Sequence, residues 1–266
     1  MRLAHFVGFA MIRDVAPLTS EAIVLRTWPL HEADLIISLF TRDFGRLKGT
    51  AKAALKSRKR FGGALEPMTV VRAWFVEKPR QELVRIDQLE IIRSPLSQPV
   101  DHVRIAVLSF YAEALDQALP EHDPQDAVFR LVTSVIEHTT VDRCWMPLTY
   151  FQLWLTRLLG LLPDLLHCTV CGEALQANEV YWNHHADGLF CHLHRHPSDG
   201  LLASESWRVA QRMLRAPVSA FSGEMWNPGD GADLRKFTLQ TLERHIEKKL
   251  RTAEILARLS RLKQSD

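Results

Sequence analysis

FGRLKGTAKAALKSRKRFGGALEP, residues 44–67, joins two apolar, strand-like segments through a strongly basic loop. Between positions 42 and 60 the only acidic residue is Asp43, whereas the whole chain balances 33 basic against 31 acidic residues. The positive charge is therefore concentrated here, and a localised positive field suits a polyanion. The basic residues of this stretch are Arg42, Arg46, Lys48, Lys52, Lys56, Arg58, Lys59 and Arg60.

The residues just before the loop alternate between small or apolar and basic side chains. In GRLKG, residues 45–49, this alternation places Arg46 and Lys48 on one face of a strand. We expect phosphate groups to be the target of that face. An ordinary solvated loop is the alternative interpretation of any run of charges. The position of this run between two strands favours phosphate binding.

Length and composition bound the protein class. A chain of 266 residues suggests two domains, or one domain with appendages. With 47% hydrophobic and 24% charged residues we expect a soluble globular protein without a membrane span. The opening MRLAHFVGFAMI has a short apolar run that contains His5, and it lacks a cleavage pattern for a signal peptide. We interpret residues 1–19 as a cytoplasmic N-terminal extension.

Residues 20–93 are predicted to form a β-rich domain. Five short segments rich in branched and aromatic residues are separated by turn signals, which is typical of a small closed barrel. A five-stranded barrel of the OB type is the natural candidate, because it binds single strands across one face with basic loops at its rim. The pattern does not distinguish it from an SH3-like barrel. The five segments are SEAIVLRTW, ADLIISLFT, GRLKGTA, MTVVRAWFV and ELVRIDQLEII.

Residues 94–266 are predicted to form a helical domain with a compact insertion at 167–197. After Ser94 and Pro95 the apolar residues recur at helical spacing, and we expect Phe151, Trp154 and Leu158 to pack in the core. The last predicted helix is amphipathic and basic, and it either extends the polyanion surface or offsets the helix dipole. The predicted helices cover 101–119, 123–138, 147–162, 204–215 and 234–262.

Three cysteines and a histidine in the insertion have the spacing of a metal site. Cys168 and Cys171 form a Cys-x-x-Cys turn, and about twenty residues later Cys191 and His194 form a Cys-x-x-His pair. This predicts a structural Zn²⁺ site, closed by four ligands and therefore stabilising rather than catalytic. Buried cysteines without a metal are the alternative. The competing candidates for the fourth ligand are His192, His196, His184 and His185.

Motifs of several enzyme classes are absent from the sequence. There is no Gly-x-x-x-x-Gly-Lys-Ser/Thr, no Gly-x-Gly-x-x-Gly at the start of a βαβ unit and no His-Glu-x-x-His. The zinc deaminase pattern also fails, because no His-x-Glu precedes the cysteine pair. We therefore expect a protein that is not an enzyme, and we name no catalytic residue.

With the barrel, the helices and the metal insertion in this order, the chain resembles the RecO family of bacterial recombination mediators, which act in the RecFOR pathway. Residues 21–67, from EAIVLRTW to RFGGALEP, are similar to the family's N-terminal OB-fold signature. LGLLPDLLHCTVCGEAL resembles the entry to its zinc insertion, GLLASES its exit, and RHIEKKLRTAEIL its closing helix. One departure is His194, where the family often has cysteine. Residues before Ser20 have no counterpart in the family pattern.

The resemblance implies a function in DNA repair and recombination. It implies binding to single-stranded and double-stranded DNA, annealing of complementary strands, and interaction with RecR and single-stranded-DNA-binding protein to load RecA. It also implies a cytoplasmic protein that is associated with the nucleoid during repair. The residues alone predict a polyanion-binding barrel, in which the basic residues listed above contact phosphates.

Two other function classes compete with DNA binding. In the first, the chain is a zinc-stabilised scaffold whose barrel binds protein, with no affinity for DNA. In the second, it is a metal-dependent nucleic-acid enzyme, which needs an open metal position or a carboxylate pair that the sequence does not show.

Overall fold

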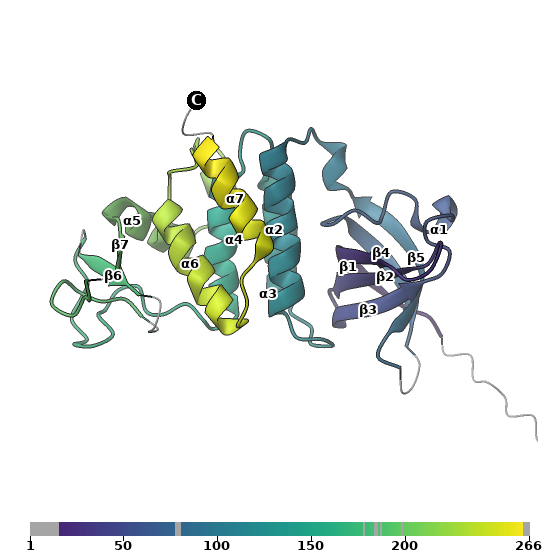
Figure 1. Ribbon diagram of the computed structural model, residues 1–266, viewed down its shortest axis with the longest axis horizontal. Helices are drawn as coiled ribbons and strands as arrows, with labels where there is room; N and C mark the ends of the chain where they lie inside the picture. The colour runs from purple at the N-terminus through teal and green to yellow at the C-terminus, as the bar shows by residue number, and fades with distance from the viewer. Residues whose placement is uncertain are drawn as a thin grey trace, which may run out of the picture.

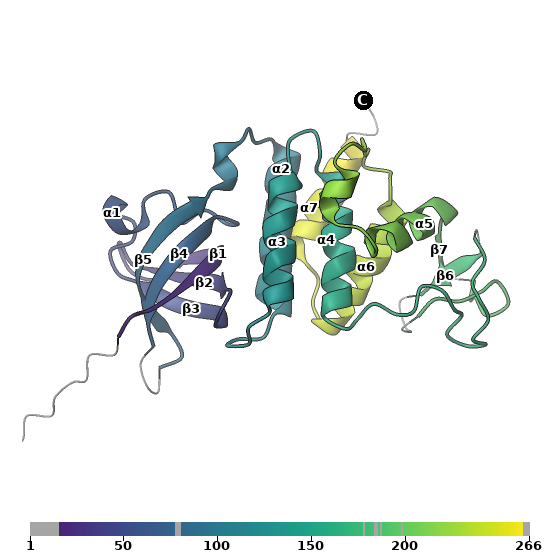
Figure 2. The ribbon, with the colours of Figure 1, turned by 180° about the vertical axis from the view of Figure 1, so that it is seen from behind.

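The structure is a computed structural model that describes residues 16–77, 81–177, 179–183, 186, 188–197 and 199–262. The molecule is elongated, with a β-barrel at one end, helices in the middle and a small lobe with a two-stranded sheet at the other (Figure 1). The view from behind shows α2 and α3 as the helices nearest the barrel (Figure 2). Most of the predicted N-terminal extension, up to residue 15, lies outside the described residues, and the first strand begins at Leu18.

The five predicted strands are all present and form a closed barrel. The strand order is β1-β2-β3-β5-β4, and β4 returns to pair with β1. All neighbours are antiparallel except β3 and β5, which run parallel. This is the order of an OB-fold, so the prediction of that fold class is confirmed. The strands are β1 (Leu18–Pro29), β2 (Leu35–Thr41), β3 (Gly45–Ala51), β4 (Val70–Val76) and β5 (Val84–Arg93).

Side chains of β3 alternate strictly between the barrel interior and the outside, as the sequence predicts. Gly49 on this strand packs against β5, where a Cβ atom would lie 2.6 Å from Ile86 Cγ1. A larger residue would push the two strands apart, so glycine is required for the barrel to close here.

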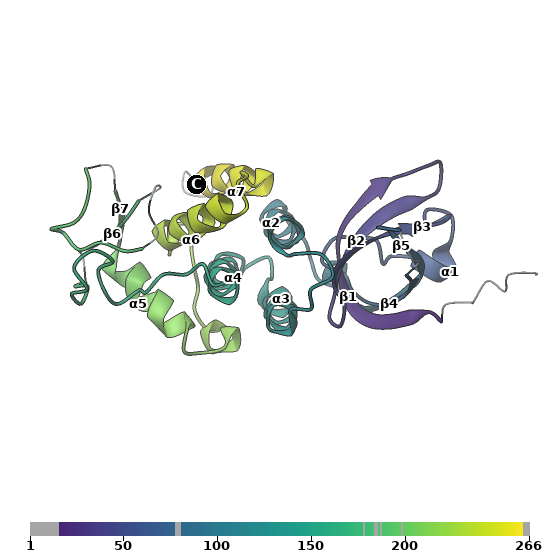
Figure 3. The same ribbon diagram turned by 90° about the horizontal axis from the view of Figure 1, so that it is seen from below.

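The segment between β3 and β4 closes the end of the barrel. It contains the short helix α1 (Arg58–Phe61), and its apolar residues Ala54, Phe61 and Ala64 are buried in the barrel core. The predicted basic loop is therefore an ordered cap, which we define as residues 52–64 and call the cap segment. Seen from below, α1 lies on the side of the barrel away from the other helices (Figure 3).

The helical part packs around one continuous core. Phe151 is fully buried there, 4.4 Å from the ring of Tyr111 between centroids, which confirms that this part of the apolar stripe is core. The division of the chain into domains at residue 93 stays a prediction. The elements are η1 (Pro95–Ser97), α2 (His102–Ala118), α3 (Asp126–His138), α4 (Trp145–Leu158), β6 (Val180–Trp182), β7 (Gly200–Leu202), α5 (Ser204–Met213), η2 (Val218–Phe221), α6 (Ala232–His245) and α7 (Arg251–Leu262).

The predicted single helix at 234–262 is wrong, because the structure divides it into α6 and α7. The chain turns at Glu247, whose φ of 53° is left-handed and incompatible with a continuous helix. The Glu243 carboxylate stabilises the turn by accepting hydrogen bonds from the backbone N–H of Leu250 (2.9 Å) and from Lys249 Nζ (2.6 Å). Apolar periodicity continues through such a turn, so the sequence pattern does not reveal it.

A buried arginine fixes the connection between the barrel and the helices. Arg104 is 1% exposed, and its guanidinium donates to the backbone carbonyls of Thr139 (2.9 Å), Pro95 (2.8 Å) and Pro99 (3.1 Å). These bonds satisfy a buried charge with backbone dipoles. They hold residues 95–99 against the end of α3, so the linker has one conformation.

The barrel docks on the helices through a network of ion pairs. Asp116 of α2 is 7% exposed and accepts a hydrogen bond from Ser38 Oγ at 2.7 Å. Arg46 reaches the same region, with its Nη1 3.8 Å from Asp116 and 3.1 Å from Glu121, and its Nε donates to Leu119 O at 2.9 Å. Lys48 Nζ lies 2.8 Å from Glu121. Both basic residues of β3 are thus engaged within the protein.

Arg46 and Lys48 therefore help to dock the barrel on the helices, and their predicted contact with phosphates stays a prediction. The strand face was predicted correctly, but α2 and the loop after it cover that face. The Arg46 side chain is only 11% exposed, and the hydrogen bond from Lys48 and the charge of Arg46 hold the pKa of Glu121 below its usual value.

Among the described residues, no helix is long and apolar enough to span a membrane.

Replacing Arg46 with alanine should lower the free energy of unfolding by about 3 kcal/mol, because it leaves the buried Asp116 carboxylate without its cation. Lys48→Ala is the matched control. Its ion pair with Glu121 is 39% exposed on the lysine side, so its loss should cost less than about 1 kcal/mol. Urea denaturation measures both values, and equal effects of the two substitutions would contradict this account of the interface.

Candidate functional site

The cap segment presents a row of basic side chains to solvent. Lys52, Lys56, Arg58 and Lys59 are all exposed, whereas Ala54 and Phe61 face the barrel interior. Within the described part of the chain, none of the four forms an ion pair with a carboxylate. No acidic residue occurs between positions 44 and 65. The cap segment is therefore a concentrated, uncompensated positive surface.

Two other predicted residues are engaged by the protein itself. Arg60 donates from Nη2 to Lys52 O (2.7 Å) and from Nε to Ser57 Oγ (3.1 Å), and its guanidinium lies over the Phe61 ring. Arg42 pairs with Asp126 at 2.8 Å. Arg60 thus gives the cap segment its shape, and Arg42 holds the barrel to α3.

The predicted metal-site residues come together in the distal lobe. The ligand atoms of Cys168, Cys171, Cys191 and His194 all lie within 4.8 Å of one another. The sulfur of Cys191 is 3.2 Å from His194 Nδ1 and 4.0 Å from the sulfur of Cys171, and Cys168 Sγ is 3.7 Å from the same ring nitrogen. With metal–sulfur bonds of about 2.3 Å, the edges of a tetrahedral site are about 3.8 Å. The four residues therefore fit one metal ion.

Two tight turns and the strand between them build this cluster. Gly172 has a φ of 74°, and its N–H donates to Cys168 O at 2.9 Å, which closes the first turn. His194 N–H donates to Cys191 O at 3.1 Å in the second turn, and Thr169 N–H donates to Leu189 O at 2.9 Å between them. Backbone hydrogen bonds alone thus bring the two ligand pairs together.

The surroundings of Cys168 favour a thiolate, the form that binds metal. Burial raises the pKa of this thiol, but hydrogen bonds from the backbone N–H groups of Cys171, Cys191 and Val170 lower it to about 6. Of the competing histidines, the two that the structure describes are not part of the cluster. His192 Nδ1 lies 2.9 Å from Glu179, His196 is outside the group, and His184 and His185 lie outside the described residues.

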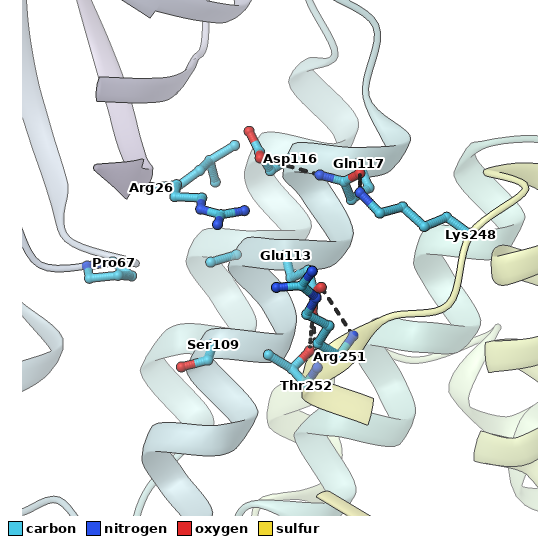
Figure 4. Close-up of a pocket in the computed structure, with 11 residues that line it drawn as sticks. Arg26, Pro67, Ser109, Glu113, Asp116, Gln117, Lys248, Arg251 and Thr252 are labelled. Carbon is cyan, nitrogen blue, oxygen red and sulfur yellow. Dashed lines mark hydrogen bonds between the residues drawn. The ribbon is translucent and has the colours of Figure 1, made fainter. Parts of the chain in front are cut away.

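A cleft of about 320 Å³ separates the barrel from α2 and the start of α7 (Figure 4). Arg26 enters it from β1, while Lys248 and Arg251 enter from the turn after α6. Glu113 accepts hydrogen bonds from the backbone N–H of Arg251 (3.1 Å) and Thr252 (2.9 Å), so it caps α7. Sequence analysis missed Arg26 at this cleft, because no local pattern links a β1 residue to the C-terminal turn.

Comparison with known proteins agrees with this geometry. Residues 15–95 match the family model for the N terminus of recombination protein O, and residues 99–254 match the model for its C terminus. The chain belongs to the RecO family. It is 50% identical over 240 residues to the DNA repair protein RecO of Koribacter versatilis (strain Ellin345), which covers 90% of this chain and 98% of that protein. A RecO of Syntrophotalea carbinolica is 31% identical over 212 residues, which cover 77% of this chain and 80% of that protein.

Replacing His194 with alanine should weaken metal binding by more than about 100-fold, since loss of a ligand exceeds the effect of losing an outer hydrogen bond. His192→Ala is the matched control and should keep the metal content of the unmodified RecO chain. Metal per chain, measured by plasma mass spectrometry, is recorded together with the midpoint of thermal unfolding. Retention of a full metal complement by the His194 variant would show that another residue is the fourth ligand.

Proposed function

We propose that this RecO protein binds DNA through the cap segment and promotes recombinational repair without catalysing a chemical reaction. The observation that carries the proposal is the row of exposed, unpaired basic side chains at Lys52, Lys56, Arg58 and Lys59. Arg42, Arg46, Lys48 and Arg60, which the sequence also suggested, serve the fold in this proposal, because each one makes contacts within the protein.

Contacts to phosphate groups explain why we expect the protein to bind DNA of any sequence, single-stranded or double-stranded. Lysine and arginine side chains that neutralise phosphates release counterions, which gives affinity with little dependence on base sequence. Both single-stranded and double-stranded DNA present these phosphates. A basic surface also reduces the repulsion between two complementary strands, so annealing requires no nucleotide hydrolysis.

Family membership supports the proposed partners. We infer that the protein acts at the nucleoid in the cytoplasm, where it contacts RecR and single-stranded-DNA-binding protein and thereby helps to load RecA. The geometry of the barrel leaves the cap segment accessible at one end of the molecule while the helices and the metal lobe extend away from it. Protein partners can therefore approach the helical part without displacing DNA from the cap segment.

We propose Zn²⁺ as the metal of the distal lobe. Three cysteines and one histidine are the donor set of structural zinc sites, and a set of four protein ligands leaves no position for a substrate. Cys168, Cys171, Cys191 and His194 would hold the ion, and its role would be to stabilise the lobe.

A protein-binding scaffold is the second candidate function. It is favoured by two large apolar side chains exposed on the metal lobe, Val170 (61%) and Leu193 (75%). They lie in the two turns whose cysteines and histidine come together, and contiguous exposed apolar surface marks protein-contact sites. Partner binding that is insensitive to salt, in the absence of affinity for DNA, would favour this candidate over the first.

The variant K56A/R58A/K59A should reduce the salt dependence of single-stranded DNA binding. At about 0.7 units per neutralised phosphate, the slope of log K against log salt should fall by about two. Arg60 is left intact because it shapes the cap segment. The matched control K56R/R58K/K59R keeps the charge and should keep the slope. Fluorescence anisotropy over a salt series measures both, and an unchanged slope in the alanine variant would remove these residues from the DNA site.

The purified protein should accelerate the pairing of complementary oligonucleotides without ATP, because screening of phosphate repulsion needs no energy source. The K56A/R58A/K59A variant should lose this acceleration while keeping its metal content and its unfolding midpoint. Fluorescence quenching between labelled strands follows the reaction. No acceleration by the unmodified protein at any salt concentration would contradict the proposed role in annealing.

A further inference from the structure

A second basic surface, formed by arginines, lies at the end of the helical part that is far from the barrel. Arg208, Arg212 and Arg215 are exposed and are spaced four and three residues apart on α5 and the turn that follows it. This spacing places all three on one face of the helix. Together they line a hollow of about 400 Å³, whose remaining walls are Gln211, Ala216, Ala220 and Phe221.

The central arginine of this row is held in position. The Arg212 guanidinium lies 5.2 Å from the centre of the Phe221 ring and forms an ion pair with Glu224. Trp226 Nε1 donates to the other oxygen of Glu224 at 3.2 Å, so the carboxylate is fixed as well. Arg208 and Arg215, on either side, form no ion pair within the described part of the chain. In the hollow, the Arg208 and Arg215 guanidinium groups therefore have no carboxylate partner among the described residues. Arg212 lies between them and is held by Glu224 and Phe221.

A second hollow continues the first along α5. It shares Gln211 and Arg215 with the first and adds Arg157 of α4, whose guanidinium lies 5.7 Å from the centre of the Trp154 ring. The carboxylate of this hollow, Asp164, accepts a hydrogen bond from the backbone N–H of Leu166 and pairs with His167. The two hollows thus form one groove with a row of guanidinium groups, which we call the α5 groove.

We propose that the α5 groove binds the sugar–phosphate backbone of a second DNA strand. Guanidinium groups match phosphate oxygens with paired hydrogen bonds. The end of α5 and the turn after it cover the seven positions from Arg208 to Arg215, about 10 Å at helical rise. This is the axial length over which one strand of a duplex carries about three phosphates. Two of the lining residues, Ala216 and Ala220, have small side chains that leave room for a nucleic-acid backbone.

This inference rests on the proposed DNA binding by the cap segment and adds a consequence to it. The α5 groove and the cap segment lie on opposite sides of α2, α3 and α4 (Figures 1 and 3). Two strands can therefore be held by one molecule without competing for the same surface. Repulsion between their phosphates is reduced by the distance and by the arginines themselves.

The test is bridging of two non-complementary oligonucleotides, one immobilised on a surface and one labelled in solution. The unmodified protein should capture the labelled strand on the surface. R208A/R215A should reduce this capture by about tenfold or more, because two charge-assisted contacts are lost. It should bind the immobilised strand itself within about twofold of the unmodified protein. The control R130A/K236A removes the same charge from exposed positions on α3 and α6 and should bridge normally.

The outcomes separate this inference from the function on which it rests. Loss of first-strand binding when K56A/R58A/K59A is added to R208A/R215A, with bridging already reduced in R208A/R215A, supports both. Normal bridging by R208A/R215A, with sedimentation showing the same mass as the unmodified protein, would overturn the α5 groove as a DNA site and leave the cap segment intact. First-strand binding that is the same in R208A/R215A and in K56A/R58A/K59A/R208A/R215A would instead contradict the proposed function, because the α5 groove is removed from both.

Discussion

The buried carboxylate of Asp116 is the constraint on which the arrangement of the two halves depends. An acidic side chain that is 7% exposed needs hydrogen bonds and an oppositely charged neighbour to be stable. Ser38 and Arg46, both from the barrel, supply them, and the barrel therefore docks on α2 in one orientation. Because Arg46 pairs with Asp116 and Glu121, it is not free to contact a ligand of the barrel. The strand face turned towards the helices carries docking contacts, whereas the basic side chains of the cap segment at the other end of the barrel stay exposed.

The cap segment combines a structural role with the DNA-binding role that we propose for it. Ala54, Phe61 and Ala64 fill the end of the barrel, and the basic residues between them are forced outward because the interior has no room for a charge. An acidic neighbour would neutralise the surface, and none occurs in the segment. The same short sequence thus closes the barrel and positions positive charge on a rigid support. Rigid support reduces the entropy lost when a strand of DNA binds.

Much of this structure follows from local sequence patterns. Alternation in GRLKGTA predicts β3 and its two faces, and the Cys-x-x-Cys and Cys-x-x-His spacings predict the residues that cluster in the metal lobe. Contacts between distant residues do not follow from such patterns. Nothing near Arg46 indicates that Asp116, seventy positions later, will take its charge. The turn at Glu247 is hidden for a related reason, since Glu243 stabilises it through side-chain contacts that leave the apolar period unchanged.

Photo-crosslinking of single-stranded DNA to the full chain would show directly which surface the DNA contacts. A photoreactive residue replaces Leu55, which is 60% exposed in the cap segment and carries no charge, or Ile105, which is 49% exposed on α2. The account predicts strong crosslinking from position 55 that competes with unlabelled DNA, and none from position 105. Crosslinking from position 105 without any from position 55 would contradict the assignment of the cap segment as the DNA surface.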